Sequence, residues 1–262
     1  MEGALLAWWL TLCAGAAINL LLWVGSAGRL RHRAAQMPAE VRSSRKQMLW
    51  LSAAYVLGCA FRSVFPMVDA PRLCLHDTWI SRIVVGRTIA TIAELCFAFQ
   101  WALLLREAGT RTATLAGRLI VPIIVVAELF SWSAVLTSNY LLHAVENSLW
   151  TLAAALVLVA FLSIRPRVEA GAARFLAAAS VCAVVYLAFM MTVDVPMYLS
   201  RWQSAAGSLS LEEGLRTLFA RCVVGRDWNS WREDVPWLSL YFTVGVWISI
   251  ALAHAPQLRT SK

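Results

Sequence analysis

The chain has 262 residues, of which 60% are apolar and only 15% charged, and its mean hydropathy is +0.66. This composition excludes a soluble globular protein and predicts an integral membrane protein whose first partner is the lipid bilayer. The net charge of +8 does not indicate nucleic-acid binding, because basic residues in such a chain orient membrane helices and contact anionic lipid.

Seven apolar segments are each long enough to cross a hydrocarbon core about 30 Å thick. Their Ala and Leu content predicts helices, whereas a transmembrane β-barrel would alternate polar and apolar residues. The segments are approximately 4–26, 48–66, 83–105, 119–137, 147–164, 174–197 and 236–254. The first has no basic n-region, so we expect a retained span and not a cleaved signal. The sequence therefore predicts one all-α domain, residues 1–262, built as a polytopic seven-transmembrane-helix bundle.

Basic residues are distributed unevenly between alternate connections. The connections after spans 1, 3 and 5 and the C-terminal tail hold fourteen Lys and Arg residues, counting Arg174 at the start of span 6. The short connections on the other side hold only Arg72 and Arg82. Because short cytoplasmic connections carry an excess of Lys and Arg, we expect the N-terminus outside and the C-terminus in the cytoplasm.

Two cysteines lie in connections on the expected outer side. Cys74 follows span 2 and Cys222 follows span 6, whereas the other four cysteines lie within spans. Thiols facing an oxidising compartment can pair when their Cα atoms lie within about 7 Å. The sequence allows a disulfide between Cys74 and Cys222, and two unrelated thiols are the alternative.

The long outer connection between spans 6 and 7 contains a helical pattern. Ser210 and Glu213 have the spacing of a capping box. Apolar residues then recur on one helical face at Leu211, Leu215, Leu218, Phe219 and Cys222. We therefore expect an amphipathic interfacial helix over 210–224, lying on the outer bilayer surface or covering the bundle.

The chain is rich in tryptophan, with thirteen residues of this type. Trp228, Trp231 and Trp237 follow the expected interfacial helix in a polar stretch. Tryptophan favours the membrane interface, because its ring is apolar and its N–H needs a partner. We expect most of the three to be interface anchors.

Several ionisable side chains lie inside the spans, where they are costly and are usually paired or functional. They are Arg62, Arg87, Glu94, Glu128, Asp194 and, at a span end, Glu146. Arg87 and Glu94 share one stripe of span 3, because they are seven residues apart. We expect at least three of Arg62, Arg87, Glu94 and Asp194 to line one cavity. A structural ion-pair network is the alternative.

In a functional site built from these residues, the basic groups would bind the substrate and two acidic groups would transfer protons. The expected substrate-binding residues are Arg62, Arg87, Trp101 and Glu146. The two arginines would hold an anionic group by fork-shaped hydrogen bonds. Glu94 and Asp194 would be the catalytic acid–base or proton-coupled pair, because a desolvated carboxyl holds its proton more tightly. Pro196, close behind Asp194, is expected to end the sixth helix.

No sequence motif identifies a cofactor. His143 and Glu146 have the i, i+3 spacing of metal pairs in helix bundles, but one such pair is weak evidence and we expect no metal. The only lysines, Lys46 and Lys262, lie outside the spans, which excludes a retinal Schiff base. Motifs of thiol oxidoreductases, zinc proteases and serine hydrolases are absent from the sequence.

The residues predict an outward-facing intramembrane pocket for a small or lipid-like anionic substrate, with acid–base chemistry of the isomerase or cyclase type. Whether the protein is an enzyme stays open. One alternative is a proton-coupled small-molecule transporter, which would need a second route past Gln100 to the inner side. The other is a non-catalytic subunit that docks on another membrane protein.

Overall fold

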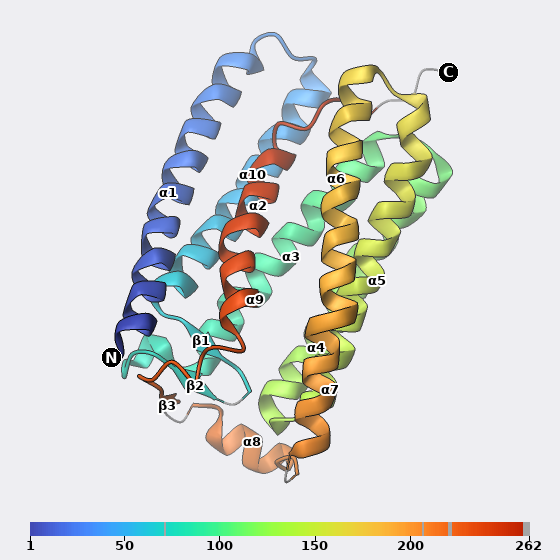
Figure 1. The fold of residues 1–262 in the computed structure, drawn as a ribbon. Helices are drawn as coiled ribbons and strands as arrows, with labels where there is room; N and C mark the ends of the chain where they lie inside the picture. Colours follow the sequence, from blue (N-terminus) through green and yellow to red (C-terminus); the bar gives the residue numbers. More distant parts are fainter. Residues whose placement is uncertain (71, 206, 220–221, 259–262) are drawn as a thin grey trace.

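The computed structural model describes residues 1–70, 72–205, 207–219 and 222–258. These residues form a bundle of long helices that carries a small layer of strands and one short helix at one end (Figure 1). We call this the sheet end and the other the opposite end. The N-terminus lies at the sheet end, and α10 finishes at the opposite end.

The chain runs along the bundle seven times. The first five passes are α1 (Gly3–Ala34), α2 (Ala39–Val64), α3 (Ile83–Glu107), α4 (Arg111–Thr137) and α5 (Tyr140–Ile164). The sixth joins α6 (Ala170–Phe189), the π-helical turn η3 (Met190–Asp194) and α7 (Val195–Ser204). The seventh joins α9 (Val235–Leu240), the π-helical turn η4 (Tyr241–Gly245) and α10 (Val246–Leu252). The 3-10 turns η1 (Trp79–Ser81) and η2 (Arg165–Arg167) lie between passes.

Six of these passes are long and apolar enough to cross a membrane, as judged by length and composition. The predicted helical membrane bundle is confirmed to that extent. The helix α2 has a comparable length, but charged and polar residues such as Arg45, Lys46 and Arg62 lower its mean hydropathy. Small residues bring neighbouring helices together: a Cβ atom at Gly58 of α2 would lie only 2.9 Å from the Cβ of Ala93 on α3.

The prediction that Pro196 ends the sixth helix is wrong. The helical backbone continues through η3 and α7 to Ser204. A proline in a regular α-helix clashes with the carbonyl four residues earlier, here that of Thr192. The π-helical turn widens the backbone at this place, and the N–H of Val195 donates to the carbonyl of Met190. Pro196 then occupies the first turn of α7, where it needs no N–H.

The sheet end holds three two-residue strands in the order β1-β2-β3. The strands β1 (Met67–Val68) and β2 (Leu73–Cys74) pair antiparallel, and β2 pairs parallel with β3 (Val223–Val224). Cys74 and Cys222 are joined by a disulfide with their Cα atoms 5.8 Å apart, within the expected distance. The disulfide therefore fixes the connection between the sixth and seventh passes to the connection between the second and third.

The expected helix over 210–224 is shorter in the structure. The described helix α8 covers Leu211–Leu218, and its predicted cap is present, because Ser210 accepts a hydrogen bond from the N–H of Glu213. Residues 220 and 221 lie outside the described residues. Val223 and Val224 form β3 instead of continuing the helix. The N–H groups of Val223 and Gly225 donate to the carbonyls of Arg72 and Cys74, and the disulfide holds the segment beside β2. Local periodicity does not reveal these contacts.

The helix α8 packs on α4, and most of its apolar side chains turn outward, whereas Leu218 packs against the core of the sheet end. A Cβ atom at Gly214 would overlap the carbonyl of Leu136, so glycine permits the close approach. Leu211, Leu215 and Phe219 are each more than half exposed. This helix therefore presents an apolar face that other described parts of the chain do not cover.

Trp231 is not an interface anchor, the role that we expected for most of the three tryptophans. Its side chain is fully buried, its indole N–H donates to the carbonyl of Gly225 at 3.0 Å, and its ring packs against Trp8. The core of the sheet end therefore contains Trp231, whose burial could not be predicted because its neighbours in the sequence are polar. Trp228 is partly buried against the same core.

At the opposite end, Arg45 of α2 forms a bidentate ion pair with Glu107 of α3, with N···O distances of 2.7 and 2.9 Å. Deeper in the bundle, the amide of Gln100 is fully buried and donates to the carbonyls of Met48 and Ser249. These contacts fix α2, α3 and α10 to one another.

The disulfide gives a first test of the sheet end. The denatured, unreduced protein should show four reactive thiols, because Cys13, Cys59, Cys96 and Cys182 are free. Replacing both bonded cysteines by serine should lower the free energy of unfolding by about 2–5 kcal/mol, since the bond closes a long loop. A Cys182→Ser variant, which removes an exposed free thiol, is the control. A count of six reactive thiols would rule the bond out.

Candidate functional site: a buried acidic cluster and a cavity

The guanidinium of Arg87 lies among four carboxylates in the interior of the bundle. Its Nη2 donates to Glu94 at 2.8 Å and to Glu128 at 2.7 Å. Its Nη1 lies 3.6 Å from Asp69 and 3.5 Å from Glu146. All five side chains are about nine-tenths buried or more. We call these five residues the acidic cluster.

The cluster gathers side chains from four parts of the chain. Arg87 and Glu94 lie two turns apart on the same face of α3, as predicted. Glu128 comes from α4 and Glu146 from α5. Asp69 comes from the turn after β1.

A glycine on α3 allows the β1 segment to approach Arg87. A Cβ atom at Gly86 would overlap the sulfur of Met67, so only glycine lets Met67 pack directly on α3. This packing brings the following turn, and with it Asp69, beside Arg87. Neither contact could be read from periodicity, because both depend on how a loop folds back onto a helix.

Hydrogen bonds hold the carboxylates in place. Tyr241 of η4 donates to Glu94 at 2.9 Å, and Thr91 donates to Glu128 at 2.6 Å. The Nδ1 of His143 lies 2.8 Å from the second oxygen of Glu146. The seventh pass is thus connected to the cluster through a tyrosine that sequence reasoning missed, since a tyrosine in an apolar helix carries no signal of its own.

Arg62 lies apart from the four carboxylates. Its Nη2 donates to the carbonyl of Met67 at 3.3 Å, and its guanidinium lies 5.7 Å from the ring centroid of Phe242. The two arginines that we expected to act together are therefore in different surroundings.

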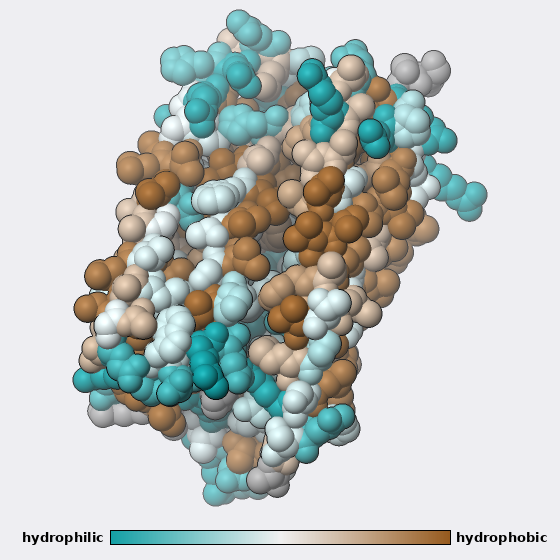
Figure 2. Space-filling view, viewed as in Figure 1, coloured by the Kyte–Doolittle hydropathy of each residue, from teal (hydrophilic) through white to brown (hydrophobic). Residues whose placement is uncertain are grey.

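A cavity of about 610 Å³ begins at the cluster and extends toward the opposite end. Glu146 and Phe161, both on α5, line it, and fifteen residues of helix correspond to about 22 Å. One wall is α6, which packs mainly on α5, and the facing wall is α9, η4 and α10. Figure 2 shows the surface hollowed between these walls, with apolar side chains around the hollow.

Three of the four residues predicted to share a cavity line this one: Arg62, Arg87 and Glu94. Trp101 and Glu146 line it as well. Asp194 does not, and its carboxylate accepts a hydrogen bond from Asn147 at 2.5 Å. Asn147 itself lines the cavity, so Asp194 lies one side chain behind the cavity wall.

Two features of the cluster bear on metal binding. One carboxylate oxygen each from Glu94, Glu128 and Glu146 lie within 4.8 Å of one another, a spacing that could hold a metal ion. Two of these residues, however, already contact the Arg87 guanidinium at hydrogen-bond distance. A cation is thus present among these oxygens as part of the chain.

At the mouth of the cavity near the sheet end lies Asp234, just before α9. Arg201 of α7 pairs with it at 3.3 Å and with Glu233 at 2.8 Å. Burial raises the pKa of Asp234, and the Arg201 guanidinium opposes that change. This pair connects the sixth pass to the seventh.

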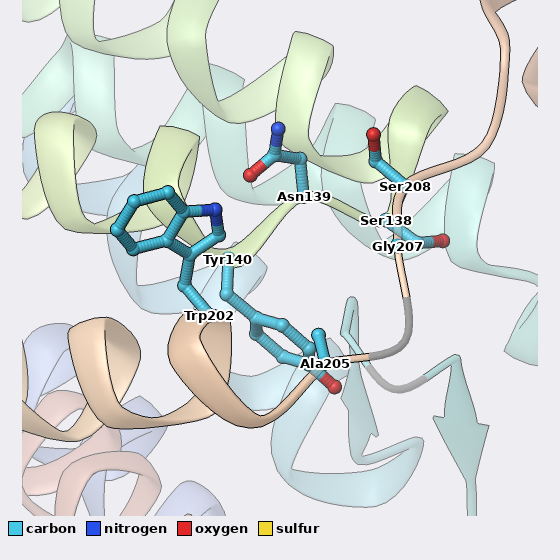
Figure 3. Close-up of a pocket in the computed structure, with 7 residues that line it drawn as sticks. All are labelled: Ser138, Asn139, Tyr140, Trp202, Ala205, Gly207 and Ser208. Carbon is cyan, nitrogen blue, oxygen red and sulfur yellow. The ribbon is translucent and has the colours of Figure 1, made fainter.

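A second, smaller pocket of about 150 Å³ lies between the α4–α5 turn and the end of α7 (Figure 3). It is lined by Ser138, Asn139, Tyr140, Trp202, Ala205, Gly207 and Ser208. None of these residues lines the large cavity, so the two are separate.

Comparisons with known protein families, curated proteins and solved structures find no match for this chain.

The cluster predicts unequal effects of removing its two kinds of charge. Arg87→Gln leaves four buried carboxylates without their shared cation, and breaking a buried ion pair costs about 3–5 kcal/mol. Glu128→Gln keeps an oxygen acceptor for Arg87 and removes one of several like charges, so it should cost much less. Thermal unfolding in detergent should therefore show a large loss of stability for the first variant and a small change for the second.

The exposed pair Arg216–Glu212 provides the control, because Arg216→Ala breaks a surface ion pair of little energetic value. Equal destabilisation by Arg87→Gln and Glu128→Gln would contradict an excess of carboxylates at the cluster.

Proposed function

We propose that this protein binds a lipid-like molecule in the cavity and carries out acid–base chemistry on it at the acidic cluster. One observation carries the proposal: a long, mainly apolar cavity between α6 and α9–α10 ends at a group of buried carboxylates. An apolar chain would lie along the helices, and its reactive end would meet the carboxylates. A cavity with an apolar lining and a few convergent polar groups is typical of small-molecule sites.

The cluster is suited to give and take protons. Four carboxylates share Arg87, so the low-dielectric interior favours protonation of those that remain uncompensated. A carboxyl of this kind could protonate a C=C bond of the ligand. The O–H bond breaks, a C–H bond forms, and the electron pair of the O–H bond stays on the carboxylate. Glu94 is the preferred donor, because it lines the cavity and shares the Nη2 of Arg87 with Glu128, so that a proton on Glu94 relieves the repulsion between the two carboxylates.

A second carboxylate would complete the reaction. The cation formed on the ligand would lose a proton from a neighbouring carbon to Asp69 or Glu146, which also line the cavity. The product is an isomer or a ring, and the balance requires no oxidant or reductant. We therefore propose a reaction of the isomerase or cyclase type, as expected from the sequence.

The anionic head group expected from the sequence is not part of this proposal. Arg87 already contacts four carboxylates, so it offers no free positive charge to an anion. Arg62 alone would remain for that role.

The surroundings of Gln100 support the transporter alternative less well than the enzyme proposal. Gln100, which we expected to mark a route to the inner side, does not line the cavity and has its amide bonded to Met48 and Ser249. The subunit alternative rests on the exposed apolar face of α8, which a membrane surface would cover equally well.

For the topology, we propose that all seven passes cross the bilayer, with the sheet end and N-terminus outside and the C-terminus in the cytoplasm. The helix α2 has the length of a span and packs between α1, α3 and α10, where neighbours shield its polar side chains. The helix α8 would lie at the outer surface with its leucines in the lipid.

Blocking the cavity should remove ligand binding without unfolding the protein. Ala183→Trp places a large ring in the α6 wall, whereas Ala188→Trp adds the same ring at an exposed position of α6 outside the cavity. Native mass spectrometry of protein purified in mild detergent should detect a retained lipid-like molecule in the parent and in Ala188→Trp, but not in Ala183→Trp. Equal retention by both variants would contradict the proposed site.

Topology can be tested by thiol labelling from each side of the membrane in a cysteine-free background. Cysteines at positions 40 and 257, which are both exposed, should react from the cytoplasmic side, and a cysteine at position 207 from the outside. Reaction of position 207 from the cytoplasmic side would reverse the orientation and place the cluster near the inner surface.

A further inference from the structure

The acidic cluster contains more negative than positive charge. Asp69, Glu94, Glu128 and Glu146 bring four carboxylates, whereas Arg87 is the one guanidinium within ion-pair distance of them among the described residues. Even when Arg62 is counted, the carboxylates outnumber the guanidiniums by two, and the further ionisable partner beside them is His143, whose Nδ1 lies 2.8 Å from Glu146. In a low-dielectric interior this imbalance is costly, and it is relieved by bound protons or by a further positive charge.

Acceptor atoms at the same place have no donor. The Oδ1 of Asp69 and the Oε1 of Glu128 are buried without any hydrogen-bond partner. The Nε2 of His143 is also buried and unpartnered, whereas its Nδ1 faces Glu146. Asp69 and His143 both line the cavity. The Oδ1 of Asp69 is thus a buried acceptor without a donor on the cavity wall, and the Nε2 of His143 is another when Nδ1 carries the proton toward Glu146. The Nε of Arg87 is the one unpartnered donor of the cluster among the described residues. The surplus of acceptors points to a ligand that brings a hydrogen-bond donor or a positive charge.

Aromatic rings surround the space next to these acceptors. Trp237 stacks on Phe189 with centroids 6.0 Å apart and packs on Tyr241, the residue that donates to Glu94. Tyr198 packs on His143 at 5.2 Å. All four of these aromatic rings line the cavity. The faces of such rings attract cations, most strongly where water is excluded.

We infer that the sheet end of the cavity binds a positively charged group carried on an apolar chain, such as a protonated or quaternary amine. The inference rests on the proposed function, because it assigns a charge to the reactive end of the ligand described above. The same surroundings stabilise a cationic amphiphile and a carbocation formed by protonation of an apolar ligand. Carboxylates attract the positive charge, and the rings hold it without forming a bond to it.

The test compares three amphiphiles that share a twelve-carbon chain: dodecyltrimethylammonium, dodecanol and dodecyl phosphate. Binding to the protein in nanodiscs of neutral lipid is measured by titration calorimetry, with Ala183→Trp as the reference for partition into the lipid. The ammonium compound should bind at least about tenfold more tightly than either of the others. The preference should decrease in Asp69→Asn and in Glu128→Gln, and it should persist in Glu212→Gln, which alters an exposed carboxylate.

Each other outcome overturns the inference in a distinguishable way. Equal binding of the three compounds, blocked by Ala183→Trp, would leave the proposed function intact and remove the charge preference. Tightest binding of the phosphate would assign the site to an anion held by Arg62, whose Nε is also unpartnered. Binding that Ala183→Trp does not affect would refute the cavity site itself. A stoichiometric divalent metal in the purified protein would show that an ion, and not the ligand, supplies the missing charge.

The positive charge can belong to the resting ligand or can form on it during the reaction. Comparing the quaternary ammonium compound with the molecule co-purified with the protein distinguishes these two cases. If the cation is part of the resting ligand, the quaternary ammonium should be retained on dilution as firmly as the molecule co-purified with the protein. If it forms during reaction, the ammonium compound should bind more firmly than the co-purified molecule, because it resembles the intermediate and not the substrate.

Discussion

The packing of the bundle around the cavity depends on a single buried cation. Arg87 is the group that allows carboxylates from α3, α4, α5 and the β1–β2 turn to approach one another away from water. Without it, each of these acidic side chains would have to be protonated or turned toward the surface. Glu94 extends the arrangement to the seventh pass through Tyr241. One guanidinium therefore sets the relative positions of three helices and the β1–β2 turn, and Glu94 adds the seventh pass to them.

The surplus of carboxylates around Arg87 affects how the cluster can exchange protons. A matched ion pair is neutral and has little reason to change its protonation state, whereas a cluster with surplus carboxylates can exchange protons without losing its central cation. Arg87 lies within ion-pair distance of all four carboxylates, so a change of protonation at one of them leaves the arginine with three other partners. Structural and functional roles, which the sequence presents as alternatives, are thus compatible here: the arginine fixes the geometry, and the excess of carboxylates leaves acid–base capacity next to the cavity.

Most of what the sequence predicts correctly rests on local periodicity. The apolar segments give the long helices, and the seven-residue spacing of Arg87 and Glu94 gives their shared face. Features set by tertiary contact were missed. Asp69 reaches the cluster only because Gly86 admits Met67, and the helix after Ser210 ends early because its continuation joins a strand. Trp231 is buried by the fold of a polar loop and Pro196 is accommodated by a π-helical turn, neither of which a residue pattern encodes.

The composition of α6 explains why a cavity exists beside the cluster. Small side chains on a membrane helix usually mark the face on which another helix packs closely. On α6, Ala178, Ala179 and Ala183 instead line the cavity, and the opposing residues of α9, η4 and α10 do not close onto them. Larger side chains at these positions would fill the space, and a close helix contact would remove it. Side chains as short as these alanines make fewer contacts across the cavity than a packed helix would provide. An apolar chain from the bilayer would restore those contacts, and its length along α6 would bring its end to the carboxylates around Arg87.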